Sequence, residues 1–242
     1  MKHDEQLEKA KEQALALMKV AGFSLKEDIS VTLNPDLPYM GYTTEKKGKS
    51  VIVVSGKALE SGAAVNLLIH EMSHAYRFQI NHPSHDSELI FSLVRWVTQG
   101  RVIESYQEKS IYAIVNHIQD LYADDVAFKV FAKTPQQMNL NEFFLSWIHK
   151  PHATHSSKDI WENAEFLLDA AFAQANLERH DVKDTDEKVE KAVQDFLSKV
   201  DKKLAPKYDY FKKFMVDLPK EVTKKEFEKL LIEYLSEFLK LT

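Results

Sequence analysis

The chain has 242 residues, a hydrophobic content of 44% and a formal net charge of −5, which suits a globular protein with no general attraction to nucleic acid. It contains no cysteine, which excludes disulfides, a thiol nucleophile and thiolate zinc sites, so any metal must be held by histidine and carboxylate side chains. The N-terminus is polar and no apolar run approaches the ~18 residues needed to span a bilayer. These features predict a soluble, cytoplasmic protein.

The first part of the chain mixes helical and extended patterns. Apolar spacing predicts a helix over about residues 4–20, and Gly22 stands where a C-terminal cap is expected. A second helix is expected over residues 63–80, because no Pro or Gly interrupts its apolar face. Between the two helices, β-branched segments predict a small antiparallel sheet. These segments are residues 29–33, 38–43 and 50–55.

The remainder reads as helical. Gly100 is the last glycine, and the apolar spacing is that of a helix almost throughout. The expected helices cover about residues 87–98, 102–132, 140–148, 159–175, 186–204 and 224–239. From about Glu178 onward, charges of alternating sign indicate a solvated face. We therefore expect an α+β, mostly helical chain, with a catalytic-type domain over residues 1–157 and a helical C-terminal extension over residues 158–242.

His70, Glu71 and His74 form an H-E-x-x-H pattern within the helix expected over residues 63–80. On a helix the two histidines lie one turn apart on one face, which suits Zn²⁺. Glu71 lies about 100° round the helix, where its carboxylate can take a proton from a metal-bound water. The pattern predicts one zinc ion per chain, bound by His70 and His74, with Glu71 as the catalytic general base.

The order of a helix, a small sheet and an H-E-x-x-H helix resembles that of zincin metallopeptidases, and locally that of the SprT/Spartan-like family. The likeness covers roughly Leu7 to Val97 and includes the segment His82-Pro-Ser-His-Asp-Ser-Glu88. In that family a later histidine, in a short loop before the next helix, is the third zinc ligand, and His85 is the matching position. The family usually has a glycine after that histidine, whereas this chain has Asp86.

We favour His85 as the third zinc ligand, and a second resemblance offers an alternative. Gluzincins supply it from a later helix as E-x-x-x-D, in which the glutamate binds zinc and the aspartate supports a histidine ligand. Asp120-Leu-Tyr-Ala-Asp124 is similar to that motif, with aspartate in place of glutamate. His117, Asp120 and Asp124 share one helix face, so His117 and Asp124 are candidates to support the ligands. A polar stripe on a half-exposed helix accounts for the same spacing.

The sequence therefore predicts a zincin-like, zinc-dependent metallopeptidase, a hydrolase whose partners are peptide or protein substrates, with neither membrane nor nucleic acid indicated. Residues 50–55 precede the active helix as the substrate-aligning edge strand does in zincins, so a peptide is expected to add to that strand. Two alternatives remain open: a zinc-binding scaffold or interaction protein without catalytic activity, and a zinc hydrolase acting on a non-peptide amide. His149, His152 and His155 surround Pro151 and form either a second metal cluster or a solvated loop.

Overall fold

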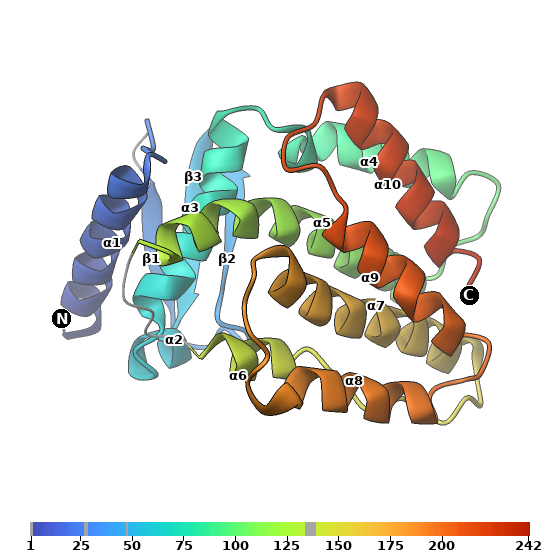
Figure 1. Ribbon diagram of the computed structural model, residues 1–242. Helices are drawn as coiled ribbons and strands as arrows, with labels where there is room; N and C mark the ends of the chain where they lie inside the picture. The colour runs from blue at the N-terminus through green and yellow to red at the C-terminus, as the bar shows by residue number, and fades with distance from the viewer. Residues whose placement is uncertain (1, 27–28, 47, 134–138) are drawn as a thin grey trace. The chain divides into compact units, whose positions relative to one another are not determined.

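The computed structural model describes residues 2–26, 29–46, 48–133 and 139–242 (Figure 1). The chain is α+β and mostly helical, as the sequence predicts. Its contacts form two compact units: unit 1 comprises residues 1–86 and 122–138, and unit 2 comprises residues 87–121 and 139–242. The expected division between residues 157 and 158 falls inside unit 2. Separate folding of residues 158–242 stays a prediction.

In its described residues, unit 1 combines a small sheet with helices, one of which is shared with unit 2. Its elements in chain order are α1 (Lys2–Ala21), β1 (Ser30–Asn34), β2 (Gly41–Lys46), β3 (Lys49–Ser55), α2 (Gly56–Glu60), α3 (Ala64–Gln79) and the 3-10 helix η1 (Pro83–His85). Helix α5 (Ser105–Phe131) contributes its residues from Tyr122 onward. The helices expected over residues 4–20 and 63–80 are confirmed as α1 and α3, whereas the short helix α2 was not predicted.

The sheet is mixed, with the strand order β1-β3-β2. Strand β1 pairs with β3 in parallel, and β2 pairs with β3 antiparallel. The prediction of a wholly antiparallel sheet is therefore wrong, as is the prediction that residues 50–55 form an edge strand, because β3 is paired on both sides. Its apolar residues suit the central place, since Ile52 and Val54 are fully buried.

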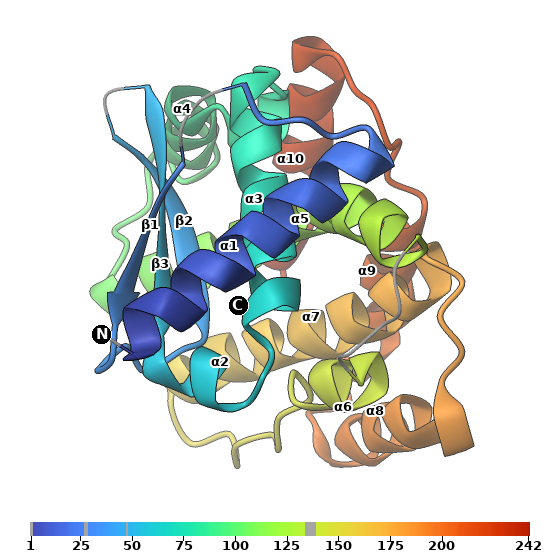
Figure 2. The same cartoon turned by 90° about the vertical axis from the view of Figure 1, so that its left-hand side faces the viewer.

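The core of unit 1 lies where α1, α3 and the end of α5 meet the sheet, and Figure 2 shows α1 crossing in front of α3, with which it is in contact. Apolar residues at helical spacing give each helix one buried face. The buried residues include Leu7, Ala14 and Met18 of α1, Leu68, Ile69 and Met72 of α3, and Val126 and Val130 of α5. Helix α1 ends as predicted: Gly22 has a φ of 95°, and the Phe23 N–H donates to the Met18 carbonyl at 2.9 Å.

Unit 2 is helical. It contains α4 (Ser87–Val97), the first part of α5, α6 (Leu140–Leu145), α7 (Ser157–Arg179), η2 (Thr185–Glu187), α8 (Lys188–Lys199), η3 (Ala205–Lys207), α9 (Tyr208–Val216) and α10 (Lys224–Phe238). Helix α7 contacts α6, α8 and α9. At the end of α7 the guanidinium group of Arg179 is buried, and its Nη1 donates to the backbone carbonyls of Met215, Val216 and Leu218, at 3.4, 3.0 and 2.6 Å. Among the described residues, no helix is both long and apolar enough to cross a membrane.

Candidate metal centre

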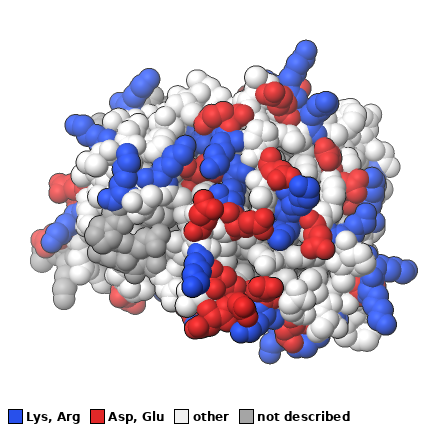
Figure 3. All heavy atoms as spheres, in the orientation of Figure 1, with Lys and Arg blue, Asp and Glu red and all other residues white. Residues whose placement is uncertain are grey.

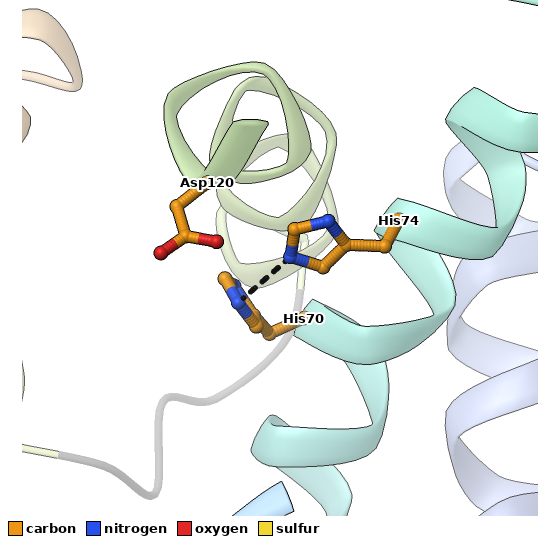
Figure 4. Close-up of side chains that lie close together, drawn as sticks. All are labelled: His70, His74 and Asp120. Atoms are coloured by element: carbon orange, nitrogen blue, oxygen red, sulfur yellow. Dashed lines mark hydrogen bonds between the residues drawn. The ribbon is translucent and has the colours of Figure 1, made fainter. Parts of the chain in front are cut away.

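The two histidines of the H-E-x-x-H pattern project from one face of α3, as their spacing requires. The Nε2 atoms of His70 and His74 lie 3.2 Å apart, and the rings meet edge to face with centroids 4.8 Å apart. The dashed line in Figure 4 joins these two nitrogens. Both rings are half-buried. The Nε2 atoms of the two rings therefore face each other, close enough to bind one ion between them.

Asp120 completes a group of three ligand atoms with these histidines. One oxygen of its carboxylate and one nitrogen of each ring all lie within 4.8 Å of one another, and Figure 4 shows the carboxylate turned toward the two rings. Helix α5 runs without interruption from Ser105 to Phe131. Asp120 and Asp124 therefore lie on the same helix, with Asp124 one turn after Asp120. Among the described residues, His70, His74 and Asp120 are the one group of His and carboxylate side chains whose ligand atoms lie close enough together to hold a metal ion.

Asp124 contacts the other nitrogen of His70. Its Oδ1 lies 2.8 Å from His70 Nδ1, and its side chain is 8% exposed. Because a carboxylate only accepts, the shared proton is on His70 Nδ1 and donates to Asp124 whenever the carboxylate is ionised. His70 Nε2 then presents a lone pair. This is the arrangement in which an outer carboxylate orients a metal-binding imidazole.

His85 lies on the far side of His74 from Asp120. Its Nε2 is 2.8 Å from His74 Nδ1, whereas the atom of His74 that faces His70 is Nε2. His85 is buried, at 4% exposure, and burial lowers its pKa well below the usual range, with a further contribution from the neighbouring His74. The structure therefore brings His70, His74 and Asp120 together and sets His85 behind His74.

Glu71 points into unit 1 and is 5% exposed. Its Oε2 lies 2.6 Å from the hydroxyl oxygen of Thr43 on β2, which is also 2.9 Å from the Glu71 carbonyl oxygen. A distance of 2.6 Å is typical of a hydroxyl that donates to an ionised carboxylate. Sequence reasoning did not single out Thr43. The sequence feature that could have pointed to it is a threonine two positions after Gly41, in one of the extended segments that precede the H-E-x-x-H helix.

His117 has partners of its own in unit 2. Its Nε2 lies 2.8 Å from Asp169 Oδ1, and its ring stacks on Phe172. His149 Nε2 lies 3.5 Å from the other oxygen of Asp169. His117 and His149 thus both approach the carboxylate of Asp169, and the expected role of His117 as a support for a zinc ligand stays a prediction.

The geometry of His70, His74 and Asp120 fits a small divalent ion. Zinc–nitrogen bonds of ~2.0–2.1 Å in a tetrahedron set neighbouring ligand atoms about 3.3 Å apart, and the two Nε2 atoms are 3.2 Å apart. The third side chain offers oxygen, a common ligand of zinc sites without cysteine. A zinc site with three protein ligands would leave a fourth position for water or a substrate atom, as catalytic zinc sites do.

Comparison with known proteins places the chain in a family. Residues 13–240 match the model of a family of unknown function, DUF5781. The chain belongs to this family. The DUF5781 match includes α3 and α5 and so every residue of the candidate metal centre. No curated protein and no solved structure matches the chain. The family description assigns no activity, so the function of this DUF5781 member has to be argued from its own side chains.

The surface charges of this DUF5781 member are of both signs. Figure 3 shows Lys and Arg side chains interspersed with Asp and Glu side chains on the face in view. Ion pairs between them are largely local to one helix, as in Lys199 with Asp195 and Lys213 with Asp217.

Proposed function

We propose that the chain is a zinc-dependent peptidase whose ion is held by His70, His74 and Asp120. The observation that carries this proposal is the approach of the two Nε2 atoms to 3.2 Å, together with a carboxylate oxygen of Asp120 and one ring nitrogen of each histidine that all lie within 4.8 Å of one another. Two imidazole Nε2 atoms that face each other at this distance are joined either by a proton on one of them or by a cation bound to both. A negatively charged carboxylate beside them favours the same cation.

The choice of zinc rests on the donor set. Two imidazoles and one carboxylate suit a borderline-soft ion, and the separation of the two nitrogens equals a tetrahedral edge for zinc–nitrogen bonds. Asp124 supports the assignment, because it accepts the Nδ1 proton of His70 and leaves Nε2 free of a proton. We therefore assign Asp120, and not His85, as the third ligand, with His85 as a neighbour of His74.

Zinc in such a site lowers the pKa of water and polarises a carbonyl group. Glu71 then acts as the general base that removes a proton from the attacking water and returns it to the leaving amine. Thr43 holds the carboxylate of Glu71 in one orientation through its 2.6 Å hydrogen bond. Because Thr43 lies on β2 and Glu71 on α3, the base is fixed from two elements at once.

The sheet edge near Glu71 supports a peptide as the substrate. Strand β2 pairs only with β3 among the described strands, so its outer edge offers backbone donors and acceptors to an added strand. Tyr39, Met40 and Tyr42 lie exposed along or just before β2, where they can contact apolar substrate side chains. A peptide paired with the outer edge of β2 would lie along the strand that contains Thr43, the residue that holds Glu71.

The test is zinc content and turnover of purified protein on an unfolded, casein-like substrate. The proposal expects about one zinc per chain, cleavage by the native protein, and loss of cleavage by several orders of magnitude in Glu71→Gln with zinc retained. His70→Ala combined with His74→Ala should lose the zinc as well. The matched control is Glu88→Gln, which removes a carboxylate from the exposed first turn of α4 and should change neither quantity.

The alternatives give different results in the same assay. Equal cleavage by native protein and Glu71→Gln would refute Glu71 as the base. Zinc binding without cleavage by either protein would favour the non-catalytic scaffold, while turnover of small amides but not of peptides would favour an amide hydrolase. Full zinc occupancy in the double histidine variant would place the metal elsewhere.

A further inference from the structure

A chain of hydrogen bonds leads from His74 into the interior of unit 1. His74 Nδ1 lies 2.8 Å from His85 Nε2, His85 Nδ1 lies 2.7 Å from the Ser84 hydroxyl oxygen, and that oxygen lies 2.8 Å from His82 Nδ1. Ser84 is fully buried, and His82 and His85 are each 4% exposed. At every link either atom can carry the proton, so the distances alone leave the direction of donation open.

One backbone group fixes that direction. The backbone N–H of Ser84 donates to His82 Nδ1 at 3.3 Å, as a cap at the start of η1. A backbone N–H can only donate, so His82 Nδ1 is an acceptor and carries no proton. The hydroxyl of Ser84, 2.8 Å from the same nitrogen, must therefore donate to it as well.

The remaining links follow in sequence. Because the single hydroxyl proton of Ser84 is used at His82, the contact with His85 Nδ1 requires the proton to be on His85 Nδ1. His85 is buried between a hydroxyl and a second imidazole, neither of which compensates a positive charge, so its ring is neutral. Its Nε2 is then an acceptor, and the proton at the last link is on His74 Nδ1.

We infer that His85 is a positioning residue, which holds the proton of His74 on Nδ1 and so directs the Nε2 lone pair of His74 toward His70 and Asp120. The inference rests on the proposed metal site and deepens it. Asp124 does the same for His70 through a carboxylate, so the two histidines are oriented by different chemistry. A neutral ring behind His74 adds no further negative charge to a site that already contains Asp120 and Asp124.

The first test is the position of the protons in the zinc-loaded protein at about pH 8, where histidine is ordinarily neutral. Long-range proton–nitrogen NMR correlations distinguish protonated from unprotonated ring nitrogens. We expect His85 and His74 to carry the proton on Nδ1 and His82 to carry it on Nε2. A proton on Nε2 of His85 would reverse the relay and overturn the inference.

The second test removes links without removing His74. Ser84→Ala takes away the acceptor of His85 Nδ1, so we expect the proton of His85 to move in part to Nε2 and the zinc affinity to fall by about tenfold. Ser73→Ala is the matched control: Ser73 is equally buried in unit 1 but bonds the carbonyl of Ile69 within its own helix. It should change neither readout, whereas equal effects of the two variants would overturn the inference.

Substitutions at His85 complete the design. His85→Gln retains an oxygen that can accept from His74 Nδ1, whereas His85→Leu fills the space without an acceptor. We expect His85→Leu to weaken zinc binding by ~10–100-fold and His85→Gln to recover most of that loss. Equal losses in both would overturn the relay and leave packing as the cause. A native protein that binds no zinc would instead overturn the proposed function, and a zinc-binding protein with a reversed relay would overturn only the inference.

Discussion

The two carboxylates on α5 provide the sharpest prediction, because they stand one turn apart and are assigned different roles. Asp120→Asn removes a charged ligand and Asp124→Asn removes the charge behind a ligand, with the same change in chemistry at both positions. We expect zinc affinity to fall on the order of 10³-fold or more in Asp120→Asn, which is about 4 kcal/mol. In Asp124→Asn we expect a fall of ~10–100-fold.

The smaller effect at Asp124 follows from its contact. Its Oδ1 accepts from His70 Nδ1 at 2.8 Å, and its side chain is 8% exposed. A hydrogen bond to a charged group contributes about 1.5–3 kcal/mol, and each tenfold change in affinity corresponds to about 1.4 kcal/mol, so one to two decades are at stake. The asparagine oxygen can still accept the proton, which limits the loss to this range.

The assay is a zinc competition titration against a chelator of known affinity, carried out on native protein and both variants at one pH. Circular dichroism of the metal-free proteins serves as the control for folding. Affinity of Asp120→Asn within tenfold of native would refute its role as a ligand. A larger loss in Asp124→Asn than in Asp120→Asn would refute the division of roles, and a larger loss in His85→Ala than in either would return the third ligand to His85.

Two further predictions concern unit 2. Arg179→Met leaves the carbonyl groups at the end of α9 without their donor, so we expect the free energy of unfolding to fall by about 3 kcal/mol in urea titrations while zinc affinity is retained; an unchanged midpoint would contradict this. Partial burial raises the pKa of Glu165 above its ordinary value of 4.5, so this group stabilises the folded state in acid and that contribution is lost as the pH rises through the folded pKa. Glu165→Gln stays neutral and should therefore gain stability relative to native protein as the pH rises above about 4.5, and a pH-independent difference would contradict the argument.

Local periodicity predicted the helices that carry the site. The spacing of His70 and His74 and the apolar face opposite them placed α3, and the absence of Pro and Gly placed α5. Helix α2 was missed because five residues are too few for a periodic pattern. Helix α9 was missed although Tyr208, Phe211 and Met215 have helical spacing and are buried in it.

What the sequence could not predict depends on contacts between distant segments. The turn at Gly48 joins two strands that are consecutive in the sequence, so the antiparallel pairing of β2 with β3 could be predicted. The parallel pairing of β1 with β3 was not, because it depends on how residues 35–40 cross the sheet. The choice between His85 and Asp120 likewise depends on the path of α5 past α3, which is set by packing of residues such as Val126 in the core.

Gly41 bears on how the same arrangement of residues could be recognised in the sequences of other proteins. A side chain there would place its Cβ 2.9 Å from the Val53 carbonyl oxygen and 3.1 Å from a methyl group of Leu67 on α3. The bare backbone at position 41 lets β2 approach α3 closely, and two residues later Thr43 reaches Glu71. A sequence fingerprint for this arrangement therefore needs three parts in order: Gly-x-Thr, His-Glu-x-x-His and Asp-x-x-x-Asp. Chains that have the middle part alone would lack the counterparts of Thr43 and Asp120 in this arrangement.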